Sequence, residues 1–222
     1  MVARSENGKI IAQVDFTQDV QGDEVTMHLS YHFADGSIDD EMTTYRQKDT
    51  FQLVRDHHIQ KGPFFAKPID FAVKADSGIT TSRTTDRNGK THVSSEHIDL
   101  PADLANGIVG TLLVNVPQNT APFRVGMVAP LGGGRMIRLL ISPEGERPFQ
   151  TGGQTVKATV FRIHPELGGI VGLIARLIGI QPKDVMVWVQ EGDAPVVVRI
   201  VGQLGGYGPV VSSELEGASF GK

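Results

Sequence analysis

The sequence predicts a mainly β fold of the α+β class: a large, curved antiparallel sheet or half-barrel with two helices packed on or in its concave face. Three observations predict it. Apolar and polar residues alternate with period two over several segments, short turn sequences join those segments, and only two segments have a helical pattern. No apolar stretch reaches the roughly 18 residues of a membrane span, so we expect no transmembrane segment.

The first hundred residues predict an antiparallel meander. Val25–Phe33 is the clearest strand, because its odd-numbered residues are apolar and its even-numbered residues polar. Asp86-Arg87-Asn88-Gly89 carries the strongest turn signal and predicts a hairpin. The other strands expected here are Ile38–Arg46, Phe51–Ile59, Ile69–Lys74, Ile79–Thr85 and Thr91–His97.

A helix is expected next, over Pro101–Leu113. Asp99 can cap it, Pro101 suits a first turn, and Leu104, Ile108 and Leu112 recur at helical spacing. Further strands should follow it. They are Phe123–Pro130, Met136–Ser142, Thr155–His164, Val185–Gln190, Pro195–Val201 and Pro209–Glu216.

A second helix is expected over Leu167–Ile180, which contains a single charged residue, Arg176. A helix that is apolar on nearly all sides must be buried or must cover an apolar surface. It could therefore be a core helix or a lid over an apolar cavity. No Pro/Ser-rich linker divides the chain, so we expect one domain over residues 1–222, with flexible tails at about 1–7 and 217–222.

Composition and motifs argue against several classes of protein. The net charge of −4 and the single tryptophan argue against a nucleic-acid binder, and the absence of cysteine excludes disulfides and thiolate metal sites. The 26 glycines form neither a phosphate loop nor a dinucleotide fingerprint. Gly217–Gly221 has the spacing of a nucleophile elbow, but only one residue follows it. We therefore expect no enzyme, no cofactor and no metal.

Histidines are the main alternative source of chemistry. His57 and His58 are adjacent, so on a strand they point to opposite faces, and Asp56 shares a face with His58. Asp56, His58 and His97 could meet only if their strands pair, and they would be the first residues to test for acid–base catalysis. Solvent-exposed histidines without a site are the expected reading.

The order of elements resembles the lipoprotein-carrier-like half-barrels of LolA and LolB. The resemblance rests on Tyr45-Arg46, on 99–116, and on 164–188 with its apolar insert. It implies an exported, periplasmic or secreted bacterial protein with an apolar cavity. No lipobox cysteine is present, so a lipid-anchored form is not expected.

Two functions follow as expectations. The first is non-enzymatic binding of an apolar small molecule or acyl chain in a cavity gated by the Leu167–Ile180 helix. The second is a structural or protein-interaction module whose core is filled by its own side chains. The residues expected to bind the ligand are Leu167, Ile170, Val171, Ile174, Leu177, Ile178 and Trp188.

Overall fold

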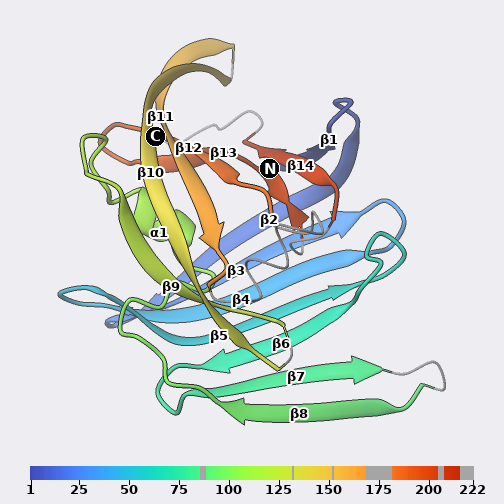
Figure 1. The fold of residues 1–222 in the computed structure, drawn as a ribbon. Helices are drawn as coiled ribbons and strands as arrows, with labels where there is room; N and C mark the ends of the chain where they lie inside the picture. The colour runs from blue at the N-terminus through green and yellow to red at the C-terminus, as the bar shows by residue number, and fades with distance from the viewer. Residues whose placement is uncertain (86–88, 132, 152, 169–181, 205–207, 216–222) are drawn as a thin grey trace. The chain divides into compact units, whose positions relative to one another are not determined.

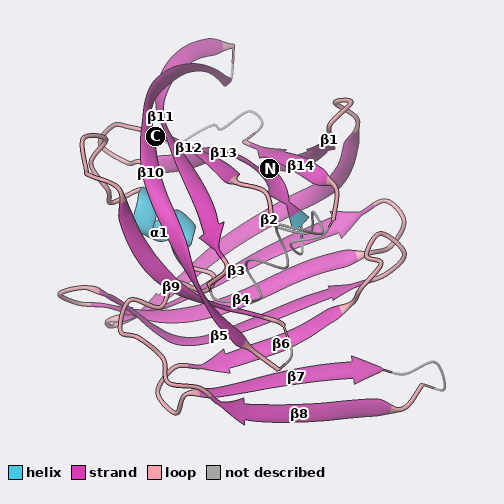
Figure 2. Ribbon diagram, in the orientation of Figure 1, coloured by secondary structure: helices cyan, strands magenta, loops and turns pink. Residues whose placement is uncertain are grey.

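The computed structural model describes residues 1–85, 89–131, 133–151, 153–168, 182–204 and 208–215. These residues form a mainly β protein, and strands make up nearly all of its regular structure (Figure 2). The strands are β1 (Val2–Ser5), β2 (Ile10–Gln21), β3 (Glu24–Phe33), β4 (Ile38–Gln47), β5 (Phe51–Lys61), β6 (Ile69–Lys74), β7 (Ile79–Thr85), β8 (Thr91–His97), β9 (Phe123–Ala129), β10 (Arg135–Thr151), β11 (Gln154–Glu166), β12 (Val185–Gln190), β13 (Val196–Gln203) and β14 (Val210–Glu214). The helix in this part of the chain is α1 (Val109–Leu113).

The strands pair in the order β8-β7-β6-β5-β4-β3-β2-β1-β14-β13-β12-β11-β10-β9, with β8 and β9 at the two open edges (Figure 1). The predicted antiparallel sheet is confirmed. Most predicted strands are present, and β6, β7, β8 and β12 have the predicted bounds. No helix in the described ranges is long and apolar enough to cross a membrane.

The chain's contacts group it into two compact units. The first unit contains Met1–Gln13, Val109–Arg124 and Leu139–Lys222, and the second contains Val14–Ile108 and Val125–Arg138. The prediction of a single domain over 1–222 remains a prediction. Each unit has its own apolar core, so each is described separately.

The second unit contains the meander from β3 to β8. Its core lies on the face of β3 that carries Val25, Met27 and Tyr31, as the period-two pattern predicts. Phe33 extends this core and stacks on Phe64, with ring centroids 4.3 Å apart. The remaining buried apolar side chains are those of Val14, Tyr45, Leu53, Phe71, Val73, Leu104, Ala105, Ile108, Val125, Val128, Ala129 and Ile137.

The helix predicted over Pro101–Leu113 is wrong in its first half. Gly107 has a φ of +66°, which a right-handed helix does not tolerate, so α1 begins only at Val109. Residues 104–108 precede the helix and run as a strap along β9. Leu104 forms a parallel bridge with Gly126, and the Ala105 N–H donates to the Gly126 carbonyl at 2.8 Å.

The first unit contains β1 and the strands from β11 to β14. Val2 and Ala3 are buried, and β1 pairs with both β14 and β2. Residues 1–7 were expected to be a flexible tail, so the structure differs there: an extended segment between two strands satisfies its backbone groups in both ladders. The buried apolar side chains of this unit are those of Val2, Ala3, Ala12, Leu113, Leu139, Ile141, Ala158, Val160, Phe161, Ile163, Val187, Val189, Val198 and Val211.

The second predicted helix, Leu167–Ile180, lies outside the described residues from 169 onward, as does the predicted tail at 217–222. Two helices packed on one sheet face are therefore not supported by the described part of the chain, which contains α1 alone. The curved half-barrel with these helices remains an expectation.

Candidate functional site

A ladder of polar side chains lies on the core face of β4 and β5 in the second unit. The antiparallel register places Asp39 opposite Gln60, Glu41 opposite His58, and Thr43 opposite Asp56. Directly opposed residues share a sheet face, so these six side chains form two parallel rows. Asp39, Thr43, Asp56 and Gln60 are all buried, whereas Glu41 and His58 are partly exposed.

Asp39 holds one end of this ladder. One carboxylate oxygen lies 2.7 Å from His58 Nε2, and the other accepts a hydrogen bond from the Gln60 amide, also at 2.7 Å. Burial lowers the pKa of His58, but the hydrogen bond to Asp39 and the charges of the neighbouring carboxylates outweigh it and raise that pKa to about 9. The imidazole is therefore held as a cation at neutral pH.

Asp56 holds the other end, beneath the strap. It accepts a hydrogen bond from the Thr43 hydroxyl at 2.8 Å and is also hydrogen-bonded by Asn106. Burial, followed by the nearby Glu41 carboxyl, raises the pKa of Asp56 to about 7. Burial likewise raises the pKa of Glu41, although the His58 charge opposes that shift. The ladder therefore contains acids and a base that bind protons more tightly than exposed groups do.

Asn106 fixes the strap over Asp56. Its side-chain nitrogen donates to the Val128 carbonyl at 2.9 Å, and the Val128 N–H donates to its side-chain oxygen at 2.8 Å. One amide thus satisfies both backbone groups of a β9 residue, as a neighbouring strand would. Gly107 then passes so close to Thr43 that a β-carbon there would overlap its hydroxyl.

The structure brings together two of the three residues expected to be tested for acid–base chemistry. Asp56 and His58 share the core face of β5, as predicted, and they interact electrostatically. His97 does not join them, because β6 and β7 separate β5 from β8. His57 faces the other way and lies 3.0 Å from Asp70. Among the described residues, no group of His, Cys, Asp or Glu is arranged to hold a metal ion.

Asp39 and Glu41 are not among the site residues predicted from the sequence. The signal for them is the parity of the strand Ile38–Arg46: Asp39, Glu41 and Thr43 alternate in step with Tyr45, whose aromatic ring is buried. A strand whose buried face is that polar is unusual. Buried carboxyl groups have shifted pKa values, and groups with shifted pKa values cluster at functional sites.

An open groove of about 700 Å³ lies in the first unit, beside the end of α1. Its floor includes the buried side chains of Phe161 on β11 and Val189 on β12. Within its lining, the Thr159 hydroxyl donates a hydrogen bond to the Glu191 carboxylate at 2.5 Å. The other residues that line it are Leu113, Val114, Asn115, Val116, Pro117, Gln118, Asn119, Gly192 and Pro195.

The ligand residues predicted from the sequence lie elsewhere or are not described. Ile170, Val171, Ile174, Leu177 and Ile178 lie outside the described residues, so their role as a gate remains a prediction. Leu167 is partly buried just after β11. Trp188 does not line the groove: it lies opposite Arg199 in the register, and the Arg199 guanidinium stands 4.9 Å from its ring centroid.

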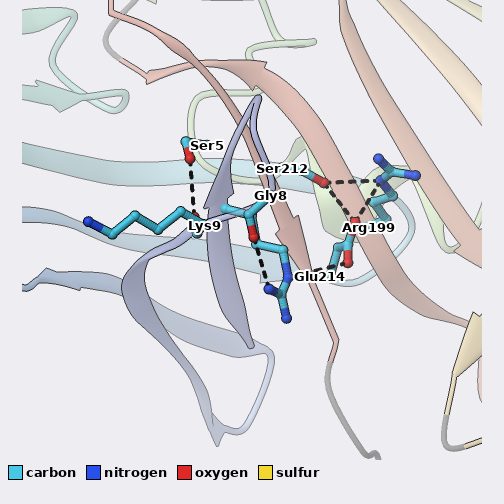
Figure 3. A network of polar contacts seen from close by, with 7 residues as sticks. Ser5, Gly8, Lys9, Arg199, Ser212 and Glu214 are labelled. Carbon is cyan, nitrogen blue, oxygen red and sulfur yellow. Dashed lines mark hydrogen bonds and ion pairs between the residues drawn. The ribbon is translucent and has the colours of Figure 1, made fainter.

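Arg199 belongs to a polar network with Ser212 and Glu214 (Figure 3). The strand register puts Arg199 on the same sheet face as Trp188. The Arg199 Nε donates to the Ser212 hydroxyl at 3.1 Å and lies 3.2 Å from Glu214, whose second carboxylate oxygen is 3.9 Å from Arg4. A pocket of about 270 Å³ opens beside these residues. Because Glu214 lies between the two arginines, this network joins β1, β13 and β14 by ion pairs.

No family model matches the chain, and no curated protein or solved structure matches it either. Function must therefore be inferred from the two sites themselves. The polar ladder can hold and exchange protons near neutral pH, while the groove offers an apolar floor with a few polar groups at its rim, the usual composition of a small-molecule site.

The ladder makes the stability of the protein depend on pH in a defined direction. The folded state binds protons at His58 and Asp56 more tightly than the unfolded state does, so stability must fall as pH rises. His58 contributes fully below its unfolded pKa of 6.5, and that contribution, roughly 3 kcal/mol, is lost by about pH 9. The free energy of unfolding declines in the same way because of Asp56, between its unfolded pKa of 3.8 and its folded pKa of about 7.

Urea denaturation at a series of pH values measures this decline. We expect the free energy of unfolding to decrease from pH 6 to pH 9 in the native chain, and we expect His58→Gln to flatten the curve over that interval. His57→Gln is the matched control, because that imidazole lies on the other face beside Asp70. Equal slopes for the native chain and for His58→Gln would contradict the assignment of the raised pKa.

Proposed function

We propose that this chain is a non-enzymatic binding protein, and that the groove beside α1 holds an apolar or lipid-like small molecule. The groove carries the proposal. Its volume of about 700 Å³ lies within the range of roughly 300–1,000 Å³ that is typical of small-molecule sites.

The lining of the groove supports an apolar ligand. Its apolar members come from the segment after α1 and from the facing strands, and they are Leu113, Val114, Val116, Pro117, Phe161, Val189 and Pro195. Glu191 is the one charged residue of the lining, and it already accepts the Thr159 hydroxyl. An anionic head group would be repelled there, so an apolar body with a neutral or hydrogen-bond-donating end fits best.

A neutral fluorescent probe, N-phenyl-1-naphthylamine, tests this proposal. We expect saturable binding with an increase in fluorescence, and we expect Val116→Asp to weaken it about tenfold or more, because a carboxylate in the groove must be desolvated when the probe binds. Val116 is partly exposed, so the substitution leaves the buried core intact. Circular dichroism and thermal melting verify that the variant is folded.

The matched control is Val20→Asp. Val20 on β2 is 64% exposed and does not line the groove, so the same substitution there should leave probe affinity unchanged. Absence of saturable binding by the native chain, or equal affinities of Val116→Asp and the native chain, would overturn the groove as the ligand site.

A further inference from the structure

The groove beside α1 contains one charged side chain, and the protein does not neutralise it. Glu191, directly after β12, is the charged residue of the lining. It accepts the Thr159 hydroxyl, and within the described ranges no lysine, arginine or histidine forms an ion pair with it. Lys157 lies two residues before Thr159 on β11, but its ammonium group pairs with Glu146 at 3.2 Å instead. A carboxylate without a counter-charge therefore borders the apolar floor.

Thr159 fixes the position of this carboxylate. Its side chain is only 2% exposed, so its hydroxyl needs an acceptor within the protein, and Glu191 supplies one. A hydroxyl donates a single hydrogen bond, which occupies Oε1 of Glu191 and leaves Oε2 for another donor. The carboxylate is thus held against the groove with one oxygen available to a ligand.

The other polar side chains of the lining add acceptors and no positive charge. Asn115, Gln118 and Asn119 line the groove from the segment after α1. The Asn115 amide nitrogen donates to the Thr111 carbonyl at 2.8 Å, so its side-chain oxygen is left as an acceptor. An ammonium group has three donors and no acceptor, and it therefore suits a carboxylate surrounded by amide oxygens.

We propose that the ligand of this groove is a cationic amphiphile, whose apolar body ends in a protonated primary amine that pairs with Glu191. This inference rests on the proposed function, because it specifies the head group of the molecule held by the same groove. The apolar body covers Phe161 and Val189 on the floor. A fatty acid has the opposite charge at its head and is repelled by the same carboxylate.

Competition among three molecules of equal chain length tests the head group. Decylamine, decanol and decanoate are used below their micelle concentrations to displace N-phenyl-1-naphthylamine from the native chain at pH 7, where the amine is protonated as a lysine side chain is. We expect decylamine to bind about three- to fivefold more tightly than decanol, the gain of one ion pair near a protein surface. Decanoate should bind most weakly of the three.

Two neutralising substitutions assign the preference to a residue. Glu191→Gln removes the charge and keeps an oxygen that can accept the Thr159 hydroxyl, so it should abolish the advantage of decylamine over decanol. Asp193→Asn is the matched control. Asp193 is exposed, lies two residues further along and does not line the groove, so its neutralisation should preserve that advantage.

The outcomes separate this inference from the proposed function. Equal displacement by decylamine and decanol, or an unchanged preference in Glu191→Gln, would overturn the amine head group while the groove remains a ligand site. An equal loss of preference in Asp193→Asn would overturn it too, because attraction to the net charge of −4 would then explain the result. Absence of saturable probe binding would instead overturn the proposed function, and the amine head group with it.

Discussion

Replacing Gly107 by alanine is expected to destabilise the protein by roughly 3 kcal/mol or more, combining overpacking with the cost of a left-handed backbone. The new β-carbon would overlap the Thr43 hydroxyl and would lie 3.0 Å from an Asp56 carboxylate oxygen. Thr43 is buried and donates to Asp56, so it cannot move aside without breaking that hydrogen bond. Either the strap or the polar ladder must shift.

Gly36→Ala separates the two contributions. Gly36 also has a positive φ, +83°, but no atom lies within 4 Å of the position that its β-carbon would take. It should therefore lose only the conformational part, about 1–2 kcal/mol. Urea denaturation of both variants measures the difference. Equal losses of unfolding free energy for the two substitutions would show that Gly107 is not in close contact with Thr43.

The strands of this fold could be predicted from the sequence because their signal is local. Turn residues at both ends of each strand predict the bounds of β6, β7, β8 and β12. β2 was missed although Val14, Phe16 and Val20 alternate with polar residues, and most of this strand is exposed. β10 extends past Ser142 to Thr151 because its last residues include charged side chains whose pairing partners lie on β11, such as Glu144 with Arg162.

The strap and the polar ladder could not be predicted, because long-range contacts decide both. Leu104 and Ile108 have helical spacing, yet the positive φ of Gly107 and the two hydrogen bonds of Asn106 to Val128 favour an extended strap. The polarity of Asp39 and Glu41 suggests a solvent-facing side of β4. Only the opposing row on β5, with His58 and Gln60, gives those carboxyl groups partners that make their burial tolerable.

Replacing Asp39 by alanine should test that dependence with the largest effect in the ladder. Asp39 is hydrogen-bonded to both His58 and Gln60, and its side chain is only 8% exposed. Its removal leaves the buried Gln60 amide and a partly buried imidazolium without their acceptor, a change that typically costs about 3–5 kcal/mol. The loss should be greatest below pH 6.5 and smaller above about pH 9, where His58 loses its proton in the native protein as well.

Asp40→Ala is the matched control for this substitution. Asp40 is the next residue of β4, points to the other face and lies 2.6 Å from His28, an Asp–His pair of similar length. The two side chains of that pair are 27% and 41% exposed, so removing the carboxylate should cost at most about 1 kcal/mol. Chemical denaturation at pH 6 compares the two variants directly. If Asp39→Ala and Asp40→Ala lose the same free energy of unfolding, the buried ladder does not depend on Asp39, and the raised pKa of His58 needs another cause.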